Sequence, residues 1–289
     1  MTRNRLFLFL AAFLFSTGGA AIKGCSLSDW QVAGFRSGIA ALALFIFLPE
    51  SRQVWRLRTW LVALAYAATL VLFVVSTKLT TSANAIFLQS TAPLYLLLLG
   101  PLILRERIRR VDVIVIAAVA AGALLLFSGR QHAIATAPDP ARGDLLGALT
   151  GITWALALTG LRWVGKRGEI SESPAAIVSA GNVVAFLICL PAALPVRSAA
   201  PQDVAILIYM GVFQIGLAYV LLTRAIRHVP GLEAATLLLV EPVFNPVWTW
   251  AIYSERPSPE ALGGGALILG ATFAGTWWRA TRAKQATLS

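Results

Sequence analysis

Two long apolar segments share the same lettering: APLYLLLLGPLILRER at residues 92–107 and EPVFNPVWTWAIYSER at residues 241–256. Pro93 and Pro242 are 149 residues apart, and so are Glu106 and Glu255. In each segment a proline interrupts the apolar run, and a Glu-Arg pair follows its end. The sequence therefore contains an internal repeat, and both copies are predicted to be membrane helices.

A proline inside a helix withholds a backbone N–H and leaves the carbonyl four residues earlier without its helical donor. Pro93 frees the carbonyl of Gln89 in this way, and Pro242 frees that of Leu238. At membrane depth such groups are tolerated only where protein or a water-filled cavity receives them. The repeat therefore indicates a transport pathway, although such prolines also kink helices simply for packing.

The composition belongs to a membrane protein. Of 289 residues, 58% are apolar and 13% are charged, and the mean hydropathy is +0.76, whereas an ordinary soluble domain has about 25% charged residues. The net charge of +11 arises from short basic clusters between apolar runs, which are typical of topology signals and not of nucleic-acid binding. Cys25 and Cys189 have no evident partners, so we expect no disulfide, metal site or cofactor.

A span needs about 20 mostly apolar residues, and this rule predicts an all-α integral membrane protein with ten transmembrane helices. The candidate spans are residues 6–24, 30–48, 59–77, 83–104, 111–128, 143–165, 174–195, 203–223, 232–253 and 260–278. The first could instead be a cleaved signal peptide. However, Phe15 and Lys23 match Trp154 and Arg162 in spacing, which makes it the counterpart of the sixth span.

Five spans in each half require the two halves to lie in the membrane with inverted topology. The predicted parts are a first five-helix repeat at 1–130, an extracytoplasmic linker at 131–142, and a second five-helix repeat at 143–289 that ends in a short cytoplasmic tail. With the N-terminus inside, 16 of the 24 Lys and Arg residues lie in inside segments and 6 in outside segments, while Arg36 and Arg162 fall within spans. This asymmetry predicts a multi-pass protein of the cytoplasmic (inner) membrane with both termini in the cytoplasm.

Glu241 is the carboxylate predicted to lie near the middle of a span, roughly 14 Å deep at 1.5 Å per residue. Glu241, Asn245 and Trp248 follow one another at helical spacing and share a face. An ionised carboxylate at that depth costs about 3 kcal/mol or more. It is therefore predicted to bind a substrate ammonium group or to couple protons; alternatively, it pairs with Arg36 or caps backbone groups loosened by Pro242.

Other polar and aromatic groups are predicted at similar depth. Phe15 and Trp154 are equivalent across the repeat and could form an aromatic cage with Trp248. Each position also has a plainer interpretation as packing, interhelical hydrogen bonding or a snorkelling anchor, the last applying to Lys78 at an outer mouth. The predicted substrate-binding residues are Phe15, Ser16, Lys78, Gln89, Pro93, Trp154, Gln214, Tyr219, Glu241, Pro242, Asn245 and Trp248.

The segments Leu104-Arg105-Glu106-Arg107 and Tyr253-Ser254-Glu255-Arg256 resemble a signature of the drug/metabolite transporter superfamily, EamA type. Halves of that family typically end in a proline-containing helix closed by a Leu-Gly-Glu-like sequence, but neither segment here keeps the glycine. Ala218-Tyr219 followed by Arg224-Ala225-Ile226 also resembles the family's second repeat. The resemblance implies a ten-helix carrier, and a further likeness to the YddG-like branch implies export of aromatic amino acids.

The predicted function is a secondary transporter that exports small metabolites, chiefly aromatic or other neutral amino acids, by alternating access through a cavity between the repeats. Drugs, nucleosides or other metabolites are alternative substrates, and proton-coupled antiport is an alternative mechanism. An enzyme is not expected, because His132 and His228 lack neighbouring groups for catalysis or metal binding; a scaffold is the remaining class. The expected partners are the small-molecule substrate and the lipid bilayer, with no nucleic acid, and the chain is a monomer or a homodimer.

Overall fold

The computed structural model of the chain describes residues 3–53, 56–104, 110–129, 133–165, 173–226 and 228–286. Within these ranges the regular structure is helical, and the only β feature is an isolated bridge between Ile134 and Ala137. The all-α prediction is therefore confirmed. The helices are α1 (Arg3–Ser16), α2 (Gly18–Gly24), α3 (Asp29–Phe47), η1 (Pro49–Arg52), α4 (Leu57–Leu79), α5 (Ser82–Gln89), α6 (Ala92–Leu99), η2 (Gly100–Leu104), α7 (Arg110–Ser128), α8 (Pro140–Gly165), α9 (Pro174–Ala193), α10 (Pro201–Ile208), η3 (Tyr209–Leu217), α11 (Ala218–Ile226), α12 (Gly231–Leu238), α13 (Val240–Tyr253) and α14 (Pro259–Ala286).

Seven segments of the described chain are long and apolar enough to cross a membrane. They are Arg3–Gly24, Asp29–Phe47, Leu57–Leu79, Val111–Ser128, Pro140–Val164, Pro174–Ala193 and Pro201–Ile226. The spans predicted at 83–104 and 232–253 are each divided into shorter helices, and the span predicted at 260–278 lies within α14. The count of ten spans stays a prediction.

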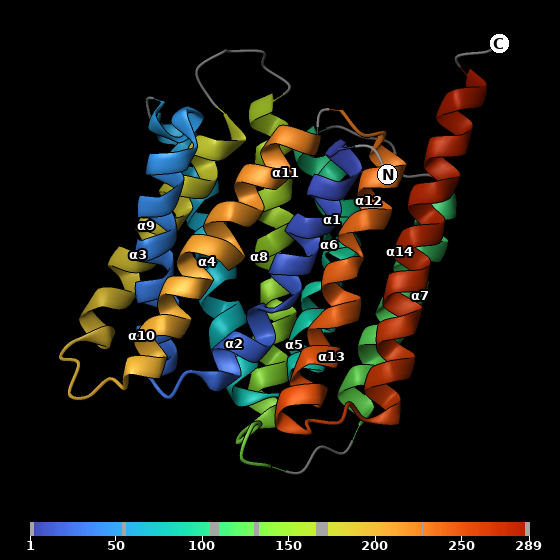
Figure 1. Cartoon of the computed structure of the whole chain (residues 1–289). Helices are drawn as coiled ribbons and strands as arrows, with labels where there is room; N and C mark the ends of the chain where they lie inside the picture. Colours follow the sequence, from blue (N-terminus) through green and yellow to red (C-terminus); the bar gives the residue numbers. More distant parts are fainter. Residues whose placement is uncertain are drawn as a thin grey trace.

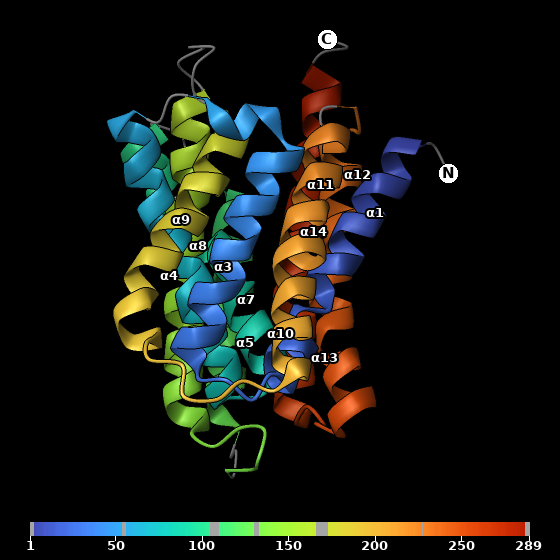
Figure 2. The same cartoon turned by 60° about the vertical axis from the view of Figure 1, so that its left-hand side comes forward.

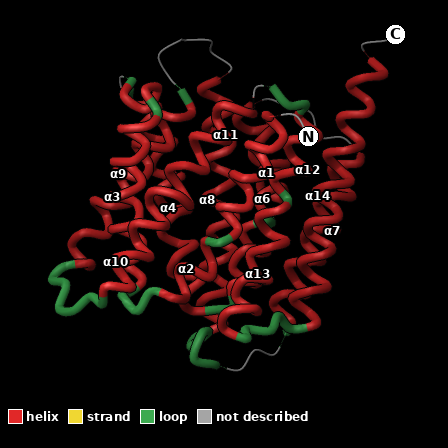
Figure 3. The backbone as a smooth tube through the Cα atoms, viewed as in Figure 1, coloured by secondary structure: helices red, strands yellow, loops and turns green. Residues whose placement is uncertain are grey.

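The helices stand side by side in one bundle (Figure 1). One group is formed by α3, α4, α8 and α9, and a second by α1, α11, α12 and α13, as the turned view in Figure 2 makes clear. The start of α1 and the end of α14 lie at the same end of the bundle, here named the termini end. The opposite or distal end holds the end of α2, the start of α5 and the end of α13; Figure 3 shows the loops that join helices there.

Two membrane-length segments are broken at matching positions. The break between α5 and α6 falls at Ser90 and Thr91, and the break between α12 and α13 falls at Leu239, which is 149 residues beyond Ser90. At each break a backbone hydrogen bond spans three residues instead of the four of an α-helix. Thr91 N–H donates to Leu88 O (3.1 Å), and Leu239 N–H donates to Thr236 O (3.2 Å). The prolines explain the position of the breaks, because Pro93 and Pro242 stand in the first turn of the helix that follows.

The end of α13 explains one departure from the family signature. Ser254, the residue directly before Glu255, has φ 55°, a left-handed conformation that glycine adopts without steric cost. Its N–H donates to Trp250 O (3.0 Å), and Glu255 N–H reaches back to Thr249 O (3.3 Å). The backbone at this position therefore has the geometry for which the signature normally supplies glycine.

We predict that Ser254→Gly stabilises the protein by about 1 kcal/mol, because it removes the cost of a left-handed non-glycine residue. Ser254→Val should have the opposite effect, since a β-branched side chain is the least tolerant of this conformation. The measurement is thermal unfolding of the detergent-solubilised protein. Equal melting temperatures for the two variants would contradict the assignment.

Candidate functional site

Gln89 and Glu241 lie beside the two helix breaks. Gln89 is the last residue of α5, and Glu241 stands in the first turn of α13. Both side chains are half-buried, and neither makes a hydrogen bond or an ion pair with the residues that the structure describes. A carboxylate in the first turn of a helix is favoured by the helix dipole, so Glu241 is stabilised there without using its hydrogen-bonding capacity. Both groups are thus available to a ligand.

A pair of hydrogen-bonded tyrosines joins α4 to α11. Tyr66 Oη of α4 donates to Tyr219 Oη of α11 at 2.8 Å. The ring of Phe15 from α1 meets Tyr219 at 5.2 Å between centroids, and Trp154 from α8 meets Tyr66 at 6.2 Å. Phenol and aromatic groups therefore come together from four helices, and Glu241 of α13 interacts electrostatically with both hydroxyls. We call Phe15, Tyr66, Trp154, Tyr219 and Glu241 the mid-depth cluster.

The chemistry of the mid-depth cluster suits an amphipathic cation. A carboxylate free of protein partners attracts an ammonium group, and the faces of aromatic rings add cation–π attraction and apolar contact. The tyrosine hydroxyls both donate and accept hydrogen bonds. These groups can therefore orient a small molecule that has a charged end and an apolar end.

The residues predicted to share one face of α13, Glu241, Asn245 and Trp248, lie in different environments in the structure. Trp248 Nε1 donates to Ser16 Oγ at 2.9 Å, and its ring packs edge-on against Phe13 at 5.4 Å. Trp248 therefore belongs to a different aromatic group from Phe15 and Trp154, whose rings pack against Tyr219 and Tyr66. The three residues do not form the predicted cage. In the structure Ser16 and Trp248 join α1 to α13.

Two further predicted residues also mediate contacts between helices. Gln214 of η3 is buried and donates through Nε2 to the carbonyl of Phe15 at 3.4 Å. Asn245 is buried and accepts a hydrogen bond from Ser82 Oγ. Each leaves one buried polar atom unpaired among the described residues, Oε1 of Gln214 and Nδ2 of Asn245.

Lys78 lies apart from the mid-depth cluster. Its Nζ donates to the carbonyl of Cys25 and so fastens the end of α2 to α4. Tyr66 is 12 residues earlier on α4, which corresponds to about 18 Å along the helix axis. The structure gives Lys78 an anchoring contact at the distal end. Its repeat counterpart Arg227 lies outside the described residues.

Arg36 does not pair with Glu241, so that alternative interpretation of Glu241 is wrong for this structure. Arg36 is 2% exposed and donates through Nη2 to the carbonyl of Leu70 at 3.1 Å. Its Nε is buried without a partner in the described part of the chain.

The distal end is closed by a buried ion pair. Lys23 Nζ of α2 lies 3.1 Å from Glu255 Oε2, and the two side chains are only 3% and 1% exposed. Glu255 Oε1 also accepts from the backbone N–H of Ser82 at 2.6 Å, and Lys23 donates to the carbonyls of Thr80 (2.6 Å) and Thr136. We call this arrangement of Lys23, Glu255 and Ser82 the distal lock. It joins α2 and α5 to the end of α13, a helix that contacts both.

The sequence pattern predicts a different environment for the lock residues. It places Lys23 in an outside segment and Glu255 beyond the end of an apolar run, whereas in the structure both side chains are buried. Glu106, the repeat counterpart of Glu255, lies outside the described residues.

Three candidate functional residues are absent from the predicted site: Tyr66, Lys23 and Arg36, whose charge acts on Tyr66. Tyr66 carried a usable signal, because the third and eighth spans are predicted repeat counterparts and each contains a tyrosine. Lys23 is the basic residue inside the first apolar run, and a charge in that place needs an internal partner. Nothing in the sequence showed which acid that partner is.

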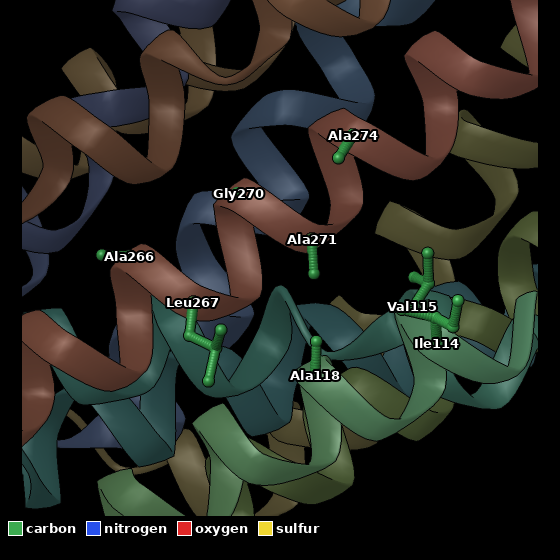
Figure 4. Close-up of a pocket in the computed structure, with 8 residues that line it drawn as sticks. All are labelled: Ile114, Val115, Ala118, Ala266, Leu267, Gly270, Ala271 and Ala274. Atoms are coloured by element: carbon green, nitrogen blue, oxygen red, sulfur yellow. The ribbon is translucent and has the colours of Figure 1, made fainter. Parts of the chain in front are cut away.

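A separate cavity lies between α7 and α14, and it is apolar (Figure 4). The residues that line it are aliphatic or glycine: Ile114, Val115, Ala118, Ala266, Leu267, Gly270, Ala271 and Ala274. It offers no polar group to orient a ligand, so it is a weaker candidate than the mid-depth cluster.

The profile of a family described as EamA-like transporter family matches residues 4–128 and 141–276. Two similar proteins carry the name pseudopaline exporter CntI and come from Pseudomonas aeruginosa strains UCBPP-PA14 and PAO1. Each is 28% identical over 284 residues and spans 93% of this chain and 94% of the relative.

A third relative, the uncharacterized transporter YwfM of Bacillus subtilis strain 168, is 24% identical over 276 residues, which span 91% of this chain and 90% of the relative. A solved crystal structure matches 96% of this chain and 98% of its own with a TM-score of 0.65 at 18% identity. At that identity it supports the fold alone.

We predict that Lys23→Met and Glu255→Gln each destabilise the protein by about 3–5 kcal/mol, because each change leaves the other lock residue buried without its opposite charge. The double variant should recover part of this loss. Glu233→Gln is the matched control, since Glu233 forms an exposed ion pair with Arg5 and should change stability by about 1 kcal/mol or less. Thermal unfolding in detergent measures all four, and additive effects in the double variant would contradict a direct interaction.

Proposed function

The chain belongs to the EamA-like transporter family, and from this premise we propose that it exports small zwitterionic metabolites, chiefly neutral amino acids with aromatic or other apolar side chains. The family and the names of its relatives indicate a membrane exporter. The observation that carries the substrate class is Glu241, a half-buried carboxylate with no partner in the described chain, which interacts electrostatically with the hydroxyls of Tyr66 and Tyr219. The carboxylate binds the substrate ammonium group, and the rings receive its side chain.

The transport path runs past the two helix breaks. In many carriers, substrates bind near the bilayer midplane at discontinuous helices contributed by two repeats. The matched breaks at Ser90 and Leu239, and the two ranges matched by the family profile, support ten helices in two inverted repeats. Gln89 supplies an amide at the first break, as Glu241 supplies a carboxylate at the second, and the carbonyls freed by Pro93 and Pro242 are further acceptors for an ammonium group.

Alternating access accounts for the distal lock. The lock joins α2 of the first repeat to the end of α13 in the second and occupies the distal end of the bundle. Substrate leaves through that end only after the Lys23–Glu255 pair separates. Loading therefore takes place from the termini end while the lock is closed, and release follows its opening.

The relatives named pseudopaline exporter favour a second candidate substrate, pseudopaline itself or a compound like it. The same transport assay distinguishes it from an amino acid, because both are offered to the same vesicles in competition.

For orientation, we propose a multi-pass protein of the inner membrane with its termini end in the cytoplasm. On a cysteine-free background, Glu50→Cys and Ser198→Cys test this, since Glu50 is exposed in η1 and Ser198 is exposed between α9 and α10. We predict that a membrane-impermeant maleimide labels Ser198→Cys in intact spheroplasts but labels Glu50→Cys only after lysis. The reverse pattern would invert the topology.

Transport is tested with purified protein in liposomes and a radiolabelled amino acid panel, with and without a pH gradient. We predict that Glu241→Gln lowers the initial rate about tenfold or more, because a hydrogen bond to a charged group contributes about 1.5–3 kcal/mol. Gln89→Ala and Trp154→Ala should also lower it. Glu260→Gln, a carboxylate in the first turn of α14, is the control and should leave the rate unchanged. Unchanged flux in all three site variants would refute the assignment of the site.

A further inference from the structure

Arg36 is a buried cation without an acidic partner. It lies within α3, one of the membrane-length segments, and is 2% exposed. The ion pairs among the described residues are Arg5–Glu233 and Lys23–Glu255, so no carboxylate of that part of the chain neutralises Arg36. A guanidinium has five N–H donors, yet the contact found for Arg36 is the one to Leu70 O, and its Nε is unpaired.

Arg36 reaches α4 next to Tyr66 of the mid-depth cluster, because the carbonyl that it bonds belongs to Leu70, one helical turn after Tyr66. The charge of Arg36 acts on the hydroxyl of Tyr66, and Asn182 of α9 also lies beside that hydroxyl. Asn182 donates to Val178 O at 2.9 Å but leaves its own Oδ1 buried and unpaired. Tyr66 in turn donates to Tyr219, which is half-buried and packs against Phe15. The positive charge of Arg36 therefore acts on the mid-depth cluster through Tyr66.

The mid-depth cluster and its neighbour thus carry groups of opposite charge that are not paired with each other. Glu241 is an acid without a protein partner, Arg36 is a base without an acidic partner, and both interact electrostatically with the hydroxyl of Tyr66. Glu241 and Arg36 make no ion pair with each other, so their fields are not cancelled by direct contact. An arrangement of this kind is complementary to a molecule that carries both charges.

We propose that the hydrogen-bonded hydroxyls of Tyr66 and Tyr219, with Arg36 beside Tyr66, form a carboxylate subsite that complements Glu241, so that the protein selects α-amino acids over amines. The proposal rests on the function proposed above and deepens it. The substrate carboxylate accepts a hydrogen bond from Tyr219, whose hydroxyl oxygen is held by the O–H of Tyr66, and the charge of Arg36 offsets that of the carboxylate in a site with little water. Arg36 is a positioning residue, because it acts through Tyr66 and need not touch the substrate.

The test on the unaltered protein compares three molecules that share one ring. They are L-phenylalanine, phenethylamine, which lacks the carboxylate, and 3-phenylpropionate, which lacks the amine. In liposomes we expect each analogue to compete with radiolabelled phenylalanine at least about tenfold more weakly than unlabelled phenylalanine does. Equal competition by phenethylamine would overturn the carboxylate subsite while leaving phenylalanine transport, and hence the proposed function, intact. No uptake of any amino acid would overturn both.

Variants then assign the subsite to its residues through the uptake of radiolabelled phenylalanine and radiolabelled phenethylamine. Arg36→Gln and Tyr66→Phe should each lower phenylalanine uptake about tenfold while changing phenethylamine uptake less than twofold. Glu241→Gln should lower both. Arg36→Lys retains the charge and should restore most of the preference for phenylalanine.

The controls separate this role from a structural one. Tyr209→Phe removes a hydroxyl that bonds Thr17 Oγ1 at 2.8 Å outside the cluster, and it should leave the ratio of the two uptake rates unchanged. An equal fall in both substrates for Arg36→Gln and for Tyr66→Phe would overturn the proposal, because loss of structure does not discriminate between them. Tyr66→Phe keeps the ring and its packing, so it decides the question even if Arg36→Gln does not fold.

Discussion

The constraint on which this structure depends is that a group buried in hydrocarbon must find its hydrogen-bonding or ionic partner inside the protein. Most of the chain satisfies it with helical backbone bonds. The described chain gives no oppositely charged partner to the carboxylate of Glu241 or to the guanidinium of Arg36, which bonds only the carbonyl of Leu70. By contrast, Lys23 and Glu255 pair with each other, and each also bonds the backbone. The same rule therefore separates the residues that hold the fold together from those left free for a ligand.

The proposed ligand site and the distal lock share one helix. Glu241 stands in the first turn of α13 and Glu255 follows its end, so about 21 Å along the helix axis separates the proposed ligand site from the distal lock. The element begins at the Leu239 break, where the chain can bend with the least loss of backbone hydrogen bonds. A movement of α13 about that break displaces Glu255 relative to Lys23 of α2. Ligand binding and the lock are thus connected through a single helix, and no longer network of side chains is required.

Part of this could be predicted from the sequence, because the signals were local or periodic. The repeat spacing of 149 residues located both breaks through Pro93 and Pro242, and the depth of Glu241 in its segment marked it as exceptional. Tertiary choices could not be predicted. The helical face that holds Glu241 also holds Asn245 and Trp248, but rotation of α13 against α1 directs Trp248 to Ser16, and the approach of α5 directs Asn245 to Ser82. Periodicity fixes a common face, and only the packing of neighbours decides which part of it meets a ligand.

The same distinction explains why only one residue of the tyrosine pair was predicted as a site residue. Tyr219 was predicted as a polar group, but its meaning depends on Tyr66, and a hydrogen bond between residues 153 positions apart has no sequence signature. Once the tyrosine pair is known, Arg36 can be assigned a role through Tyr66, which its position as an isolated basic residue in a span did not suggest. A guanidinium retained at that depth is costly, and no carboxylate of the described chain offsets the cost. Under the proposed carboxylate subsite, a substrate that brings its own carboxylate supplies the missing charge when it binds, and the cost to the empty protein then becomes selectivity for the zwitterion.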